Sequence, residues 1–231
     1  RHIATYRGVE VQHEGRNNVE RALELLDRSG RVHFRDLKRV VMYGASAGAL
    51  GAIYHFMSVD PWLGPNTQRV LLVDSPGLHW GEHFWDKFTS DLLTDISAAL
   101  GRGGFPLTLG DGNLGKHLGE ACRKYPKWRI GVLQAARDAV MSVVFGSISP
   151  WAHEKAIFAP GGMWEQGINA GDNCAVWVPS SMSHTFLVTD ATGTSTAGGK
   201  SALDFAHDVI TGFGKDHASA GPSYRDPESM R

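Results

Sequence analysis

Residues 38–57 read KRVVMYGASAGALGAIYHFM, and this stretch decides the fold. Residues 38–43 form a short apolar run with two adjacent valines, typical of a buried strand, and the run stops at Gly44. Residues 47–57 are rich in alanine and carry bulky side chains on one side, which predicts a helix directly after the strand. Because a strand followed at once by a helix is the repeating unit of parallel α/β folds, we expect an α/β protein.

The five residues Gly44-Ala45-Ser46-Ala47-Gly48 fit the pattern G-x-S-x-G and stand at the predicted turn from strand to helix. Such a turn strains the backbone of its central residue, and side chains two positions to either side would collide, so glycines are expected there. The hydroxyl of Ser46 is then lifted off the sheet, and the Ala47 N–H at the helix N-terminus faces any developing oxyanion. We interpret Ser46 as a nucleophile, with a chance match in a chain of 28 glycines as the alternative.

Three further apolar runs of strand length follow, separated by segments with helical periodicity. Strands are expected at 69–74, 128–133 and 174–179, and helices at 16–30, 82–100, 115–124, 136–145 and 201–213. This alternation predicts a mostly parallel, doubly wound sheet flanked by helices. The functional loops of such a sheet lie at the C-terminal ends of its strands, so the chemistry is expected there.

A serine hydroxyl becomes a good nucleophile only when a base takes its proton, and the base needs a carboxylate that orients it. Asp138 follows the third predicted strand and His184 follows the fourth, which gives the chain order Ser, Asp, His. Both lie beyond strand C-termini, on the sheet edge expected for Ser46. Asp74, at the end of the second strand, is an alternative acid. His207 lies inside a predicted helix and is expected to pack rather than to catalyse.

Composition excludes several classes of protein. The 231 residues include 23 Lys and Arg against 24 Asp and Glu, a net charge of −1 that argues against a nucleic-acid-binding protein. With 42% apolar and 20% charged residues, the chain has the composition of a globular domain. No apolar run approaches the roughly 18 residues of a membrane span. Cys122 and Cys174 allow one bridge or two free thiols. The oligomeric state and the compartment stay open, a secreted or periplasmic location being one option.

We expect one domain over residues 1–214. Within it, residues 79–115 are expected to form a cap or mobile loop over the site, because residues 101–115 hold six glycines without a clear period. The polar segment 215–231 contains two prolines and is expected to be a frayed tail.

Two motifs in the cap are interpreted as chance matches. Residues 79–83 (HWGEH) fit the zinc pattern H-x-x-E-H, but Gly81 weakens a helix between the two histidines. Residues 110–115 (GDGNLG) fit G-x-G-x-x-G, but Asp111 would repel a pyrophosphate. We therefore expect neither a metal nor a cofactor. His79, Trp80 and Asp74 are instead expected to contact substrate, with Trp80 stacked on a sugar ring or packed in the core.

These motifs, in this order, resemble the pectin acetylesterase and Notum family of serine carboxylesterases, which have the α/β-hydrolase fold. Residues 43–51 (YGASAGALG) are similar to the family's Gly-x-Ser-Ala-Gly-Gly stretch, 73–77 (VDSPG) to its Asp-Ser-Gly segment, and 13–18 (HEGRNN) to the segment before its nucleophile helix. The similarity covers most of residues 1–190. It implies that Ser46, Asp138 and His184 form a triad that removes acetyl or longer acyl groups from polysaccharides or lipidated proteins.

The chain departs from this family at two points. Ala49 replaces the second glycine after the serine, and no Gly-rich oxyanion loop precedes Ser46. Several strands usually come before the elbow in this fold, whereas few residues precede the strand at 38–43. We therefore expect the N-terminal strands to be missing from this chain, with one oxyanion donor lost or supplied by a second chain or another loop.

The sequence thus predicts an ester hydrolase in which Ser46 attacks a carbonyl and His184 acts as general base and then acid. Asp138 orients the imidazole, and the Ala47 N–H forms half of the oxyanion hole. The expected substrate is a small-molecule or polysaccharide ester, acetyl esters first. The alternatives are a lipid or polyester esterase whose cap sets the acyl length, and a non-catalytic binding protein of the same fold.

Overall fold

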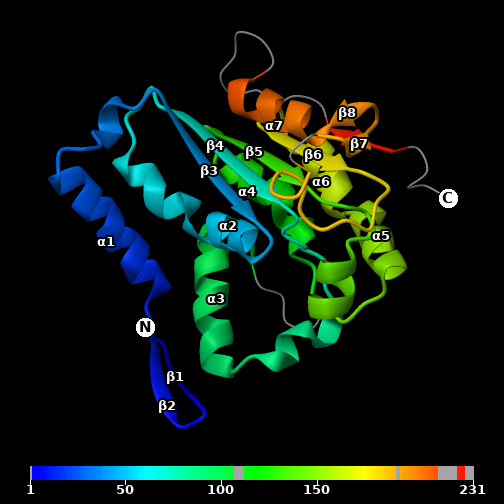
Figure 1. Ribbon diagram of the computed structural model, residues 1–231, viewed down its shortest axis with the longest axis horizontal. Helices are drawn as coiled ribbons and strands as arrows, with labels where there is room; N and C mark the ends of the chain where they lie inside the picture. Colours follow the sequence, from blue (N-terminus) through cyan, green and yellow to red (C-terminus); the bar gives the residue numbers. More distant parts are fainter. Residues whose placement is uncertain (1, 107–111, 191–192, 213–222, 227–231) are drawn as a thin grey trace.

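The protein is an α/β structure built on a five-stranded parallel sheet, seen in a computed structural model that describes residues 2–106, 112–190, 193–212 and 223–226 (Figure 1). The strand order is β3-β4-β5-β6-β9. The strands are β3 (Arg39–Ala45), β4 (Gln68–Asp74), β5 (Trp128–Leu133), β6 (Cys174–Val178) and β9 (Tyr224–Arg225). The predicted α/β class and parallel sheet are confirmed.

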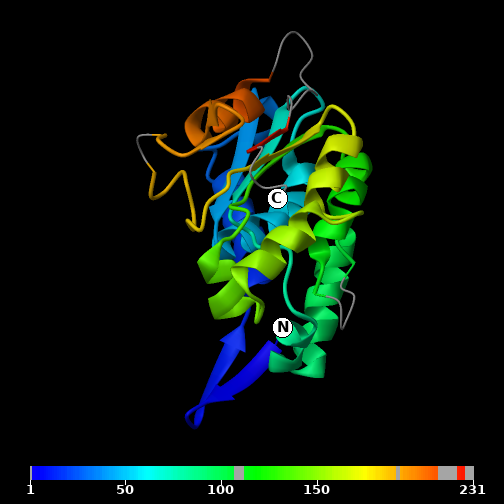
Figure 2. The ribbon, with the colours of Figure 1, turned by 90° about the vertical axis from the view of Figure 1, so that its right-hand side faces the viewer.

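Helices cover the two faces of the sheet unequally. Among the described residues, one face packs against a single helix, α7 (Ala202–Thr211), in a cluster that joins Leu72 and Trp177 to Phe205 and Val209. The other face carries the larger core, and the remaining helices lie on its side of the sheet (Figures 1 and 2). These are α1 (Gly15–Arg28), α2 (Ala47–Val59), α3 (Ser90–Arg102), α4 (Leu118–Lys124), α5 (Pro150–Phe158) and α6 (Met163–Asn169).

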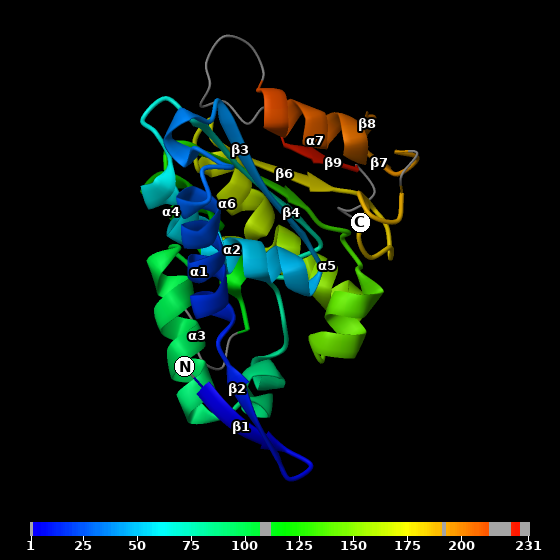
Figure 3. The ribbon, with the colours of Figure 1, turned by 60° about the vertical axis from the view of Figure 1, so that its left-hand side comes forward.

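Several elements differ from the prediction. A hairpin of β1 (His2–Tyr6) and β2 (Val9–His13) extends from the body beyond α1 (Figure 3). The helix expected at 82–100 is split into a 3₁₀ segment (Glu82–Lys87) and α3, because Thr89 caps α3 by accepting the Leu92 N–H at 3.4 Å. The helix expected at 136–145 is a π-helix over Val140–Phe145. Helices α5 and α6 were not predicted.

Part of the segment expected to be a frayed tail belongs to the sheet. Tyr224 and Arg225 form β9 and pair in parallel with Trp177 and Val178 of β6. Ser223 adds a further contact, since its Oγ accepts the Val176 N–H at 3.0 Å. Strand pairing therefore anchors residues 223–226, whereas residues 213–222 and 227–231 of the expected tail lie outside the described residues.

The remaining short elements and the cysteines complete the fold. Two-residue strands β7 (Thr196–Ala197) and β8 (Lys200–Ser201) pair ahead of α7, and short 3₁₀ segments lie at Phe34–Asp36, Asp60–Trp62 and Leu114–His117. Cys122 of α4 and Cys174 of β6 form a disulfide, which resolves the alternative left open by the sequence. Within the described ranges, no helix is long and apolar enough to cross a membrane.

Candidate active site

Ser46 occupies a strained turn between β3 and α2. Its φ of 55° and ψ of −126° lie in a region that non-glycine residues rarely adopt. Gly44 is required for close approach, because a Cβ there would lie 2.1 Å from the carbonyl oxygen of Gly48. The reverse does not hold, since a Cβ on Gly48 would meet no atom within 4 Å. The expectation that both glycines are sterically required is therefore wrong for Gly48.

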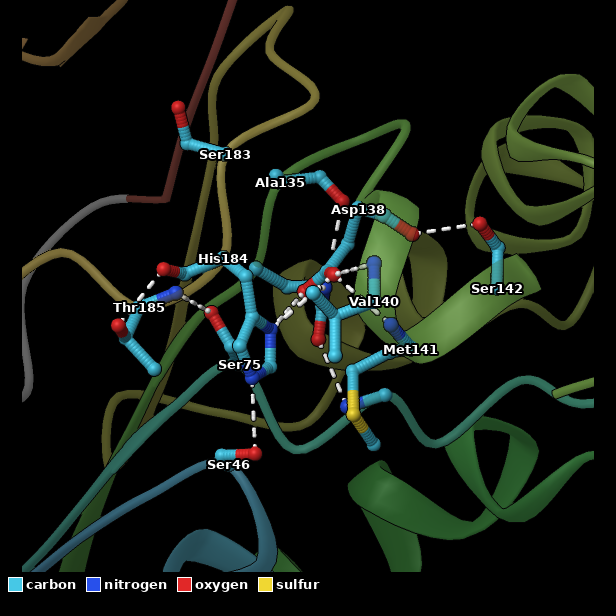
Figure 4. A network of polar contacts seen from close by, with 12 residues as sticks. Ser46, Ser75, Ala135, Asp138, Val140, Met141, Ser142, Ser183, His184 and Thr185 are labelled. Carbon is cyan, nitrogen blue, oxygen red and sulfur yellow. Dashed lines mark hydrogen bonds and ion pairs between the residues drawn. The ribbon is translucent and has the colours of Figure 1, made fainter. Parts of the chain in front are cut away.

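The three residues expected to form the triad lie in contact (Figure 4). The Nε2 of His184 is 2.8 Å from the Oγ of Ser46. On the other side of the ring, Nδ1 is 2.9 Å from Oδ2 and 3.1 Å from Oδ1 of Asp138. Because a carboxylate only accepts hydrogen bonds, Nδ1 carries the proton and Nε2 is left to accept the Ser46 hydroxyl proton.

Asp138 is buried, and its carboxylate accepts hydrogen bonds from backbone and side-chain N–H groups. Its Oδ1 accepts the N–H groups of Val140 at 3.0 Å and Met141 at 2.9 Å, where the chain enters the π-helix. Its Oδ2 accepts the side-chain amide of Gln134 at 3.0 Å. The same Gln134 accepts the Gly77 N–H at 2.8 Å and so links the loops after β4 and β5. Sequence reasoning missed Gln134, although its place directly after a buried strand was a usable signal.

The N-terminus of α2 lies directly beneath the Ser46 side chain. Ala47 is the first residue of this helix and is exposed. The first N–H groups of an α-helix have no acceptor within the helix, so the Ala47 N–H can donate to an anion beside Ser46. This placement agrees with the oxyanion role expected from the sequence.

Asp74 is the last residue of β4 and lies next to the site. Its side chain is fully buried. Its Oδ2 accepts the N–H groups of Phe186 and Leu187, each at 2.8 Å, and its Oδ1 accepts the Ser75 hydroxyl at 3.1 Å. Burial raises the pKa of the Asp74 carboxyl, and these hydrogen bonds oppose that rise. The carboxylate that contacts the His184 ring is that of Asp138, and burial leaves Asp74 unable to contact substrate.

His79 is also buried, contrary to its expected place in the cleft. It hydrogen bonds to the side chain of Asn113, and its Nε2 accepts the Met163 N–H at 3.4 Å. Burial, together with nearby His153, lowers the pKa of His79 to about 3, so its ring is neutral. The side chain of His83 is 78% exposed, so the two histidines of the H-x-x-E-H pattern do not face a common site. Among the described residues no cluster suited to a metal ion occurs.

An apolar cavity of about 220 Å³ lies between α2 and the cap. Trp80 lines it and stacks on Phe84 with ring centroids 4.5 Å apart. Leu50 lines it too, one helical turn after Ser46 along α2. The remaining lining residues are Gly51, Tyr54, Trp85, Phe88, Ile96, Leu100 and Leu114. Trp80 is therefore a cavity wall rather than an exposed platform for a sugar ring, and the cap segment, of which residues 107–111 lie outside the described residues, supplies most of the lining.

Other expectations are resolved by position. His207 lies on α7, but its side chain is 73% exposed, so the expectation that it packs in the core is wrong. Of the G-x-G-x-x-G pattern, Gly110 and Asp111 lie outside the described residues.

No protein-family model matches the chain, and no curated protein matches its sequence. The resemblance to the pectin acetylesterase and Notum family thus rests on the motifs in the sequence.

Proposed function

We propose that this chain is a serine carboxylesterase of α/β-hydrolase type that hydrolyses acyl esters, acetyl esters of carbohydrates or small alcohols foremost. One observation carries the proposal: the Ser46 hydroxyl, the His184 imidazole and the Asp138 carboxylate are joined by contacts of 2.8 and 2.9 Å. A serine so linked to a base, and a base so linked to a buried acid, is the arrangement that activates a hydroxyl for attack on a carbonyl.

The geometry suits a two-step acyl transfer. Ser46 Oγ forms a bond to the carbonyl carbon while its proton passes to Nε2 of His184, and Asp138 stabilises the resulting imidazolium. The carbonyl oxygen gains the negative charge and accepts the Ala47 N–H. His184 then returns the proton to the departing alkoxide, which leaves an acyl group on Ser46. Water repeats the sequence, giving the carboxylic acid and free Ser46.

The test is hydrolysis of p-nitrophenyl acetate, butyrate and octanoate by the wild type and by Ser46→Ala, with fluorophosphonate labelling located by mass spectrometry. Turnover that is lost in Ser46→Ala, with the label on Ser46 of the wild type, supports the proposal. Turnover that persists unchanged in Ser46→Ala contradicts it. A wild-type chain that neither turns over nor takes the label is a binding protein of this architecture rather than an esterase.

A second candidate, a lipid or polyester esterase, is favoured by the apolar cavity that Leu50 lines, one helical turn after Ser46. Its lining is almost wholly apolar and comes mainly from residues 80–114. Val143, Val144 and Phe145, which follow Asp138, are 50–66% exposed, so an apolar surface also lies near the triad. Exposed apolar side chains grouped in this way suit contact with an apolar substrate.

The same ester series separates the two candidates. A deacetylase is expected to have its highest kcat/KM on acetate, with a decline as the acyl chain lengthens. An enzyme that places the acyl chain in the cavity is expected to prefer octanoate, because each buried methylene contributes about 0.8 kcal/mol.

A further inference from the structure

Asp74 holds both ends of the catalytic contact while contacting neither reacting side chain. Its backbone carbonyl accepts the N–H of Ser46 at 2.8 Å. Its carboxylate accepts the N–H groups of Phe186 and Leu187, in the loop that carries His184. One residue thus connects the nucleophile's backbone to the base's loop.

Ser75 extends this connection by one residue. Its hydroxyl donates to Asp74 and accepts the Thr185 N–H at 2.9 Å, so three consecutive N–H groups after His184 are bound by the end of β4. Both Ser75 and Thr185 are buried and both have positive φ, of 56° and 60°. A backbone held in this conformation needs contacts that fix it, and these hydrogen bonds provide them.

The position of β4 in the sheet explains why Asp74 can do this. Strand β4 lies between β3, which is followed directly by Ser46, and β5, which leads to Asp138. In the register, Asp74 pairs with Ala45 on one side and Leu133 on the other. The loop that carries His184 follows β6, which lies on the far side of β5 from β4. The carboxylate of Asp74 binds this loop to β4, the strand next to the one that leads to Ser46.

We infer that Asp74 is a positioning residue for the proposed ester hydrolysis: its carboxylate fixes the His184 loop so that Nε2 stays within hydrogen-bond distance of Ser46 Oγ. The inference rests on the proposed function. Loss of this anchor is expected to lower kcat rather than raise KM, since Asp74 is buried and does not contact substrate. A displacement of about 1 Å between catalytic groups can cost about a hundredfold in rate.

The experiment compares Asp74→Ala with Asp74→Asn on p-nitrophenyl acetate, each assayed well below its own melting temperature. Asp74→Ala is expected to lose about a hundredfold in kcat with KM little changed. Asp74→Asn is expected to recover most of that loss, because the amide oxygen can still accept the N–H groups of Phe186 and Leu187. Ser75→Ala, which removes the Thr185 contact and the hydroxyl that donates to Asp74 but keeps the Phe186 and Leu187 contacts, is expected to lie between Asp74→Ala and the wild type.

Asp60→Ala is the matched control. Asp60 also accepts hydrogen bonds from two N–H donors, those of Arg69 at 2.7 Å and Trp128 at 2.8 Å, but it lies beyond the opposite end of α2 from Ser46. The Asp60→Ala variant is expected to have a lower melting temperature than the wild type and the same kcat. If Asp74→Ala keeps wild-type kcat, or if both alanine variants lose kcat alike, the inference is overturned.

A readout without turnover separates failure of the inference from failure of the proposed function. The proton on Nδ1 of His184, bonded to Asp138, gives a low-field NMR resonance that depends on the placement of the ring. It is expected in the wild type and in Asp74→Asn and absent in Asp74→Ala. Should the wild type fail to hydrolyse esters, the proposed function falls, while persistence of this resonance in folded Asp74→Ala overturns the positioning role by itself.

Discussion

The two ends of the central sheet both bury polar groups, but those groups lead to different places. At the amino end, Asp60 accepts hydrogen bonds from Arg69 and Trp128 at 2.7 and 2.8 Å. Nearby, the amide of Asn173 donates to the carbonyls of Cys122 at 2.9 Å and Trp128 at 3.0 Å. All of these hydrogen bonds join residues that lie outside the proposed active site. They connect strands of the sheet to neighbouring helices and loops.

At the carboxyl end, the contacts form a chain that ends at Ser46, the proposed nucleophile. Gln134 supports Asp138, Asp138 supports His184, and His184 contacts the hydroxyl of the partly exposed Ser46. Oxygen acceptors and N–H donors therefore stabilise the fold at one end and position the proposed nucleophile at the other. Substitutions at the amino end should lower stability without changing the rate, whereas substitutions in the proposed triad should act mainly on the rate.

The largest expected effect is on rate, from Asp138→Asn. The amide nitrogen cannot accept the His184 Nδ1–H, so the imidazole is driven toward the tautomer that cannot take the Ser46 proton, and kcat should fall by about 10⁴. The melting temperature should fall as well, because the new amide nitrogen would face the Gln134 side-chain donor in a buried site, so kcat is measured well below the transition. Measurement of kcat on p-nitrophenyl acetate beside Asp60→Asn checks this. Equal rate losses in the two variants would remove the contrast between the ends of the sheet.

The next effect is on stability alone, from the Cys122→Ala/Cys174→Ala double variant. The disulfide closes a loop across a sequence separation of 52 residues. In the chain-entropy account such a loop contributes about 4 kcal/mol to the free energy of unfolding. Urea denaturation should show this loss, while kcat below the transition stays at the wild-type value. The wild type treated with a reductant is the control, and a lowered kcat in the folded double variant would contradict the prediction.

His79 sharpens the comparison because it lies at the carboxyl end yet contacts no triad residue. Its folded-state pKa is about 3, whereas an unfolded histidine titrates near 6.5, so below that pH only the unfolded chain gains the proton. Its contribution to stability is complete above about pH 6.5 and is lost progressively toward pH 3. Between pH 7 and pH 5 this loss is about 2 kcal/mol.

Denaturation curves of the wild type and His79→Gln at pH 7 and pH 5 measure this contribution. The variant should lose less stability on acidification than the wild type, because glutamine does not titrate. Its kcat at pH 7 should match that of the wild type. If His79→Gln loses as much unfolding free energy between pH 7 and pH 5 as the wild type, another group causes the loss of stability on acidification.

Local pattern was enough to predict the strands and the elbow, because an apolar run, a glycine and a helix start are decided within a few residues. The order Ser46, Asp138, His184 was also predictable, since parallel strands bring their C-terminal ends to one edge of the sheet. The parts that failed depend on distant contacts. Asp74 and His79 follow a strand as substrate residues would, but the loops after β6 and before α4 bury them.

The unpredicted elements follow the same logic. Helix α5 buries His153 and exposes Trp151, whose side chain packs under the Arg137 guanidinium at 4.5 Å, so it lacks the apolar stripe by which a helix is found in a sequence. Strand β9 has two residues and forms only because β6 offers an edge. Neither could be inferred from residues adjacent in the chain.

The smallest expected effect concerns the apolar cavity between α2 and the cap, tested with Gly51→Leu. Gly51 lines the cavity, and a Cβ there would meet no atom within 4 Å, so the new side chain enters open space. If the acyl chain occupies this cavity, kcat/KM on octanoate should fall about tenfold, the low end of what a pocket distinguishes per methylene. Acetate hydrolysis should be unchanged.

The matched control is Gly101→Leu. Gly101 is an equally open helical glycine on α3 that does not line the cavity. Because leucine replaces glycine within a helix in both variants, both should melt at a higher temperature. Only Gly51→Leu should have a lower kcat/KM on octanoate. A parallel fall on acetate would instead place the cavity in contact with the alcohol side of the ester.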